Sequence, residues 1–112
     1  MNDAVAKSQL FVLDEANRPV RAESLQAWAS YMEQPHRVGK DKVNGLTIST
    51  VFMGLGGNVL GCPRPFETIV MRGDEKLAQA ERYETWDAAR RGHARWVKEL
   101  THNARKLLAA MS

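Results

Sequence analysis

The chain has 112 residues, of which 44% are hydrophobic and 26% are charged, so it can bury a core of its own and is not a disordered tail. Its net charge of +3 suits attraction to an anion but is far below that of a dedicated nucleic-acid binder. The single cysteine, Cys62, excludes an intramolecular disulfide and a multi-thiolate zinc site.

The sequence predicts a single domain over residues 9–112, preceded by a flexible N-terminus of residues 1–8. No apolar run approaches the roughly 18 residues that a membrane-spanning helix needs, and the N-terminus lacks the pattern of a signal peptide. We therefore expect a cytoplasmic protein with no membrane partner.

The first third of the chain predicts one strand and one helix. Gln9–Leu13 is a short run of strand formers followed by turn-forming residues. In Glu23–Glu33 the apolar residues recur at intervals of three and four, which is typical of a helix, and Pro35 ends it.

The middle of the chain predicts a hairpin and a further strand. Arg37–Val43 is a charged edge strand, and Asn44-Gly45 favours a type I′ turn because both residues tolerate positive φ angles. The returning strand, Leu46–Gly54, alternates with a two-residue period that directs Leu46, Ile48, Thr50 and Phe52 to one face. A second central strand follows from Phe66 to Arg72, where Phe66, Thr68 and Val70 share a face.

The last third predicts a long covering helix. Leu77–Tyr83 fits either a loop or a short helical turn and stays unassigned. Thr85 can cap a helix that starts at Trp86 and continues to Ser112, with an apolar stripe toward the sheet. The expected fold is α+β, in the order β-α-β-β-β-α, with an antiparallel sheet of about four strands and the C-terminal helix packed on one face.

The glycine-rich segment from Gly54 to Asn58 could approach an anion closely through its backbone N–H groups. It joins two strands and precedes no helix, unlike a dinucleotide fingerprint or a P-loop. The segment could be a plain connector or a loop that contacts a ligand. In the second case Asn58 is the candidate ligand contact.

Three charged residues near the last predicted strand are candidate ligand contacts: Arg64, Glu67 and Arg72. An arginine beside a strand end suits bidentate recognition of phosphate or carboxylate. The alternative is solvent-exposed charge that contributes little.

His93, with Tyr83 and Trp86 close in sequence, lies on the apolar stripe of the last helix. These three residues could line or support a ligand site, or His93 could be a packed core residue. A small hydrolase or nucleotide-modifying enzyme that uses His93 with Glu67 is an alternative function. The histidines have no metal-site spacing, and we expect neither a metal nor a cofactor.

Basic residues also recur along one side of the last helix, where they could contact nucleic-acid phosphates or simply face solvent. They are Arg91, Arg95, Lys98, His102 and Arg105. No recognition-helix signature accompanies them, so nucleic-acid binding is a third alternative.

Three segments, LTISTVFMGL (46–55), PFETIVMRG (65–73) and RYETWDAARRGH (82–93), resemble a family of small proteins from tailed phages and prophages. Similarity extends to Phe11–Val20 and Trp28-Ala29, and so to most of the chain. That family commonly has Asp-His where this chain has Gly56-Gly57. If the Asp-His pair is catalytic in the family, this chain lacks it.

The resemblance implies a phage accessory role, such as counter-defence or host takeover, and assigns no reaction. The sequence therefore favours a non-enzymatic binding protein that captures a nucleotide-like anionic small molecule or a host protein. We expect it to form a homo-oligomer.

Overall fold

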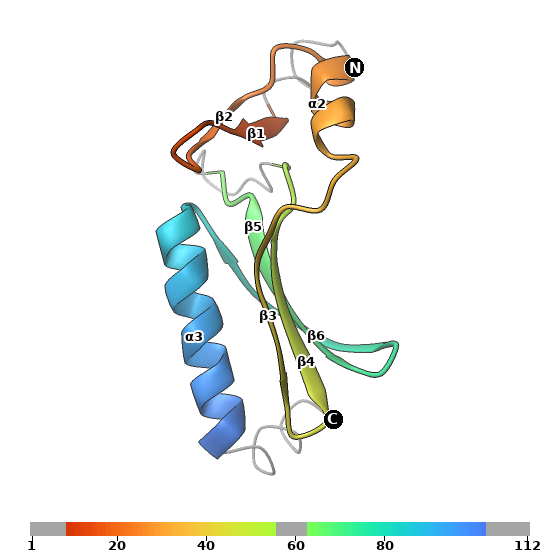
Figure 1. Ribbon diagram of the computed structural model, residues 1–112, viewed down its shortest axis with the longest axis vertical. Helices are drawn as coiled ribbons and strands as arrows, with labels where there is room; N and C mark the ends of the chain where they lie inside the picture. Colours follow the sequence, from red (N-terminus) through yellow and green to blue (C-terminus); the bar gives the residue numbers. More distant parts are fainter. Residues whose placement is uncertain (1–8, 56–62, 103–112) are drawn as a thin grey trace.

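The computed structural model describes residues 9–55 and 63–102, with the side chains of 78–80 excepted (Figure 1). The sequence predictions for the N-terminal residues 1–8, for Asn58 and for the helix beyond His102 lie outside the described residues. The described elements follow in chain order: β1 (Phe11–Leu13), β2 (Pro19–Arg21), α2 (Leu25–Tyr31), β3 (Arg37–Val43), β4 (Leu46–Phe52), β5 (Phe66–Arg72), β6 (Glu75–Tyr83) and α3 (Trp86–His102).

The fold class predicted from the sequence is confirmed. A four-stranded antiparallel sheet has the strand order β3-β4-β5-β6, and α3 packs against all four strands. Figure 1 shows α3 along one face of this sheet, with β1, β2 and α2 beyond one end of the strands.

The first predicted strand belongs to a separate two-stranded sheet, because β1 pairs with β2. Asp14 closes the turn between them: its Oδ1 accepts the backbone N–H groups of Ala16 and Arg18, each at 2.9 Å. The bond from Arg18 is the main reason that the pKa of Asp14 is lowered. Asn17 in this turn takes a positive φ of 60°, which asparagine tolerates.

The small sheet is joined to the end of β4. The backbone N–H of Phe11 donates to the carbonyl of Gly54 at 2.8 Å, and the indole N–H of Trp28 donates to the same oxygen at 3.0 Å. Gly54 has a φ of 70°, and a Cβ there would lie 2.7 Å from the Trp28 indole nitrogen. A glycine is therefore required at this junction.

The fourth strand of the main sheet, β6, includes the segment Leu77–Tyr83 that the sequence left unassigned, and it begins two residues earlier, at Glu75. Glu75–Tyr83 pairs along the whole of β5, after a turn in which Gly73 has a φ of 60°. The register shifts twice, between Thr68 and Ile69 and between Val70 and Met71. These bulges break the two-residue alternation that would otherwise mark a strand in the sequence.

The predicted alternation of β4 is confirmed, since Leu46, Ile48, Thr50 and Phe52 are all buried. Predicted turn and cap residues behave as expected: Asn44 and Gly45 have φ angles of 51° and 81°. Thr85 Oγ1 accepts the N–H of Ala88 at 3.0 Å, at the start of α3. None of the helices in residues 9–55 and 63–102 is long and apolar enough to cross a membrane.

Candidate functional site

A line of buried polar side chains crosses the core between the sheet and α3. Thr50, Thr68 and His93 are buried at exposed fractions of 0%, 0% and 7%. On one side of this line lies an apolar cluster built on Phe52 and Phe66. On the other side lies a second cluster, which includes Leu100 from α3.

These side chains form one continuous hydrogen-bonded chain, which we call the core relay: Asp41, His93, Thr50, Thr68, Tyr83 and Glu81. Asp41 Oδ2 lies 2.7 Å from His93 Nε2, and His93 Nδ1 lies 2.7 Å from the hydroxyl of Thr50. The next bonds, Thr50 to Thr68 and Thr68 to Tyr83, measure 2.6 and 2.9 Å. Tyr83 donates to Glu81 Oε1 at 3.1 Å.

The core relay ends on a carboxylate at both sides, and an ionised carboxylate only accepts hydrogen bonds. Each of its three hydroxyl groups has one proton and can donate only one hydrogen bond. Tyr83 donates to Glu81, so Thr68 donates to Tyr83 and Thr50 donates to Thr68, which leaves the Thr50 oxygen to accept from the His93 ring. The core relay therefore has one direction, from His93 through the hydroxyls toward Glu81.

Two glycines make room for the rings of the core relay. A Cβ at Gly39 would lie 2.8 Å from His93 Cδ2, and a Cβ at Gly92 would lie 2.2 Å from Tyr83 Cε1. Both distances are shorter than any normal carbon contact, so only glycine fits while the rings keep these positions.

Glu81 is the end of the core relay at the β6 edge of the sheet. It accepts a hydrogen bond from the Trp96 indole at 3.2 Å and forms an ion pair with Arg95. Burial of the Tyr83 ring raises the pKa of its hydroxyl above the usual value, and the nearby charge of Glu81 acts in the same direction.

The order Asp41, His93, Thr50 has the connectivity of an orienting acid, a base and a nucleophile. However, Thr50 is fully buried, and its hydroxyl is already bonded to Thr68. A substrate has no access to that oxygen, so the geometry favours a structural role for His93. Glu67 is next to Thr68 on the strand and projects from the opposite face of the sheet, so it is not paired with His93.

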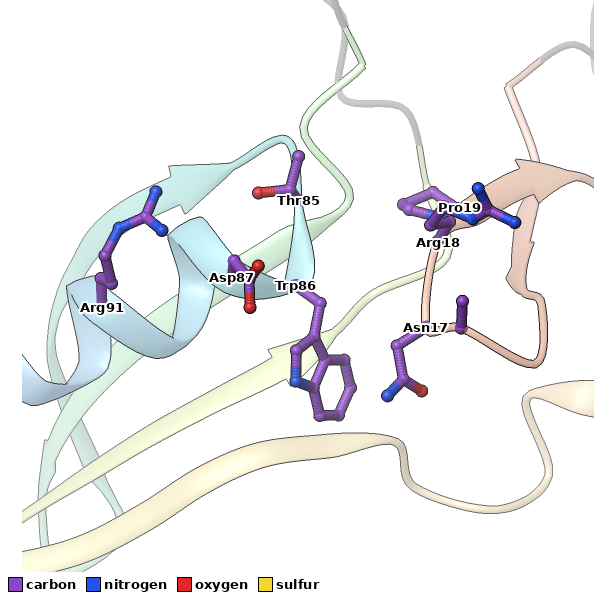
Figure 2. Close-up of a pocket in the computed structure, with 8 residues that line it drawn as sticks. Asn17, Arg18, Pro19, Thr85, Trp86, Asp87 and Arg91 are labelled. Atoms are coloured by element: carbon purple, nitrogen blue, oxygen red, sulfur yellow. The ribbon is translucent and has the colours of Figure 1, made fainter.

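A cleft of about 420 Å³ lies between the β1–β2 turn and the start of α3 (Figure 2). This volume is within the range of about 300–1,000 Å³ that is usual for small-molecule sites. We call it the turn-helix cleft; its lining residues are Ala16, Asn17, Arg18, Pro19, Thr85, Trp86, Asp87 and Arg91. Figure 2 shows the Trp86 side chain extending from α3 toward Asn17 across the cleft.

Two of the charged groups in the turn-helix cleft already have partners. Arg18 bonds to Asp14 at 3.0 Å, and Asp87 is paired with Arg90 at 3.8 Å. Arg91 has no ion-pair partner in the part of the chain that the structure describes. The charges of the lining residues and of their direct ion-pair partners thus sum to one positive charge, which favours the binding of an anion.

The structure does not bring all the predicted site residues together. Trp86 lines the turn-helix cleft, whereas Tyr83 and His93 lie in the core relay. Glu67 is buried near the start of β5, and Arg72 at its far end pairs with Glu75 at 3.6 Å. Arg64 is exposed, and its carbonyl accepts a hydrogen bond from Arg82.

Sequence reasoning missed Asp41 and the cleft residues of the β1–β2 turn. The alternation of β4 and β5 directed Thr50 and Thr68 into the core, and two hydroxyls on core faces were a usable signal of a polar network. Nothing local marked Asn17 and Arg18, which meet Trp86 only through the tertiary fold. Within residues 9–55 and 63–102, no group of three or more His, Cys, Asp or Glu side chains could hold a metal ion.

Comparisons with known proteins return nothing: no family model, no curated protein and no solved structure matches the chain.

Proposed function

We propose that this chain is a non-enzymatic binding protein that captures a planar, anionic small molecule of the nucleotide class in the turn-helix cleft. The observation that supports this most directly is the combination of Trp86 and Arg91 in the lining. An indole ring offers a stacking surface for a base, and a guanidinium group offers two parallel N–H donors to a phosphate.

The position of Trp86 supports the proposal because its ring packs against the buried core. Its plane meets that of Phe66 edge-on, with ring centroids 6.1 Å apart, and Phe66 is fully buried. Trp86 itself is half-buried and also packs on the cluster around Phe52. A ring already ordered in the free protein loses little conformational entropy when a ligand stacks on it.

The biological setting is part of the proposal and follows from the family resemblance. A protein that sequesters a nucleotide signal of the host would serve a phage as a counter-defence factor. In that role the chain would need affinity and no turnover, which agrees with the inaccessible hydroxyl of Thr50.

The test is a titration of the protein with AMP, ADP, ADP-ribose and cyclic nucleotides, in which binding is measured by tryptophan fluorescence and by thermal shift. Binding should quench the fluorescence and raise the melting temperature, and Trp86→Ala and Arg91→Ala should each weaken binding at least tenfold. Lys98→Ala, on an exposed position of the same helix, is the matched control and should bind as tightly as the unmodified chain.

No quenching and no thermal shift with any of these nucleotides would overturn the proposal. Binding that survives both Trp86→Ala and Arg91→Ala would place the ligand elsewhere on the molecule. Conversion of a bound nucleotide to product would show an enzyme in place of a binding protein.

A further inference from the structure

The sheet face turned away from α3 is strongly basic. Residues that pair across neighbouring strands point to the same face of the sheet. Since Ile48 and Thr50 face α3, their neighbours Thr47, Ser49 and Val51 face the other way. The basic residues paired in register on this second face are Arg37, Lys40, Lys42, Lys76 and Arg82.

The positive charge of this open face is not neutralised by ion pairs within the described chain, where none of the five basic side chains has a carboxylate partner. The Arg82 guanidinium donates to two backbone carbonyls, those of Arg64 at 2.9 Å and Leu55 at 3.2 Å, and a carbonyl carries no net charge. One carboxylate in the described part of this face, that of Glu67, is buried at an exposed fraction of 5%.

The centre of the open face is half-buried and only partly apolar, because Thr47 and Ser49 lie there beside three apolar side chains. Val51, Ile69 and Met71 lie on the two central strands, between the basic residues of the edge strands β3 and β6. Figure 1 shows α3 along the other face and α2 beyond the end of the strands. An apolar strip flanked by charge on both sides is the pattern expected of a surface that receives an amphipathic partner.

The width of the face decides which secondary structure fits. β3 and β6 are separated by three strand spacings of about 4.8 Å, so the two basic edges lie roughly 14 Å apart. An α-helix with its side chains is about 10–12 Å wide. One helix is therefore wide enough to cover the apolar strip. The side chains on its two flanks then lie beside the basic residues of β3 and β6.

We propose that this open face binds an amphipathic helix of a partner protein whose apolar stripe is flanked by aspartate and glutamate. Charge complementarity selects this occupant. A second copy of the chain would bring like charge, since the chain carries +3 overall and the exposed side of α3 holds Arg91, Arg95 and Lys98.

Nucleic acid is the competing class of partner, and the composition of the face disfavours it. Single strands bind to sheets by stacking their bases on aromatic side chains, and the described residues of this face include none. A duplex would satisfy the basic edges but would leave Val51, Ile69 and Met71 without an apolar partner.

The test is a selection from a library of helical peptides with fixed apolar residues at i, i+3, i+4 and i+7, in which the flanking positions vary among Glu, Gln and Lys. Enrichment of Glu at the flanks, with loss of at least tenfold in affinity for Lys40→Glu/Lys42→Glu, is the expected result. Because both lysines are exposed, the double variant should fold normally, as checked by circular dichroism.

Lys98→Glu, a charge reversal on the opposite side of the molecule, is the control and should leave peptide affinity within twofold. A selection that returns no Glu preference, or peptides that bind the double variant equally well, would overturn the proposal. So would tighter binding of oligo-dT or of duplex DNA than of the selected peptides, measured in the same buffer by fluorescence anisotropy.

Discussion

The hydroxyl oxygens of Thr50 and Thr68 lie 2.6 Å apart at directly paired positions of the two central strands, where both residues are fully buried. Each hydroxyl also has a second partner, His93 for Thr50 and Tyr83 for Thr68. A threonine pair in the middle of an apolar sheet face is stable because every polar atom in it is bonded. It also links α3 to the strands through directional contacts.

Replacing either threonine by valine should cost about 1–3 kcal/mol of unfolding free energy, because the remaining hydroxyl is left with an unsatisfied bond in the core. The double variant should cost less than the sum of the two single variants, since their shared hydrogen bond is lost only once. Urea unfolding of the four proteins measures this coupling. Thr47→Val, on the half-buried opposite face, is the control and should change stability little. Strict additivity would contradict a direct Thr50–Thr68 bond.

Replacing His93 by alanine should destabilise the fold by more than about 2 kcal/mol, because Thr50 loses one of its two hydrogen-bond partners and a cavity opens beneath α3. His102→Ala, at an exposed position on the same helix, should change the unfolding free energy by less than about 0.5 kcal/mol. Thermal and urea unfolding give both values. A stable His93→Ala protein that has lost an enzymatic activity would instead favour the hydrolase hypothesis.

Replacing Gly92 by alanine should be destabilising, although alanine is the better helix former by about 1 kcal/mol. The new methyl group would lie 2.2 to 2.4 Å from three atoms of Tyr83, whose ring is held by bonds to Thr68 and Glu81. In a Tyr83→Leu background the cost of Gly92→Ala should fall, because the ring is gone. An equal cost in both backgrounds would mean that the clash with Tyr83 is not its cause.

Much of the fold could be predicted from local sequence patterns. The parts that were not predicted have reasons that lie in the strands concerned. The hairpin at Asn44-Gly45, the faces of β4 and the Thr85 cap depend on residues close in sequence, and all were predictable. β6 was not, because its two bulges against β5 disturb the alternation. The pairing of β1 with β2 was missed because each has three residues, too few for a periodic signal.

The candidate site was harder to predict because its parts converge only in three dimensions. Asp41 and His93 are 52 residues apart, and the position of Asp41 in a charged edge strand indicated nothing beyond solvent exposure. Trp86 was a predicted site residue, yet its facing residue Asn17 belongs to a turn that no motif marks. Spacing along the chain identifies neighbours on one element and cannot identify contacts between elements.

The raised pKa of Tyr83 predicts a loss of stability at alkaline pH. In the unfolded chain the phenol loses its proton near pH 10, whereas burial keeps it protonated to higher pH in the folded protein. Below pH 10 both states hold the proton, so the contribution is fully present. As pH rises above 10 the unfolded state holds fewer protons than the folded state, and the unfolding free energy therefore falls until the folded pKa is passed.

Urea unfolding at a series of pH values from neutral to alkaline tests this prediction, together with tyrosinate absorbance of the folded protein. Tyr83→Phe should lower stability at neutral pH, because Thr68 and Glu81 lose a partner, and should flatten the alkaline decline. Tyr31→Phe is the matched control, since it removes the other tyrosine of the chain and leaves the core relay intact. A decline that persists unchanged in Tyr83→Phe would assign the alkaline transition to another group and remove Tyr83 as its origin.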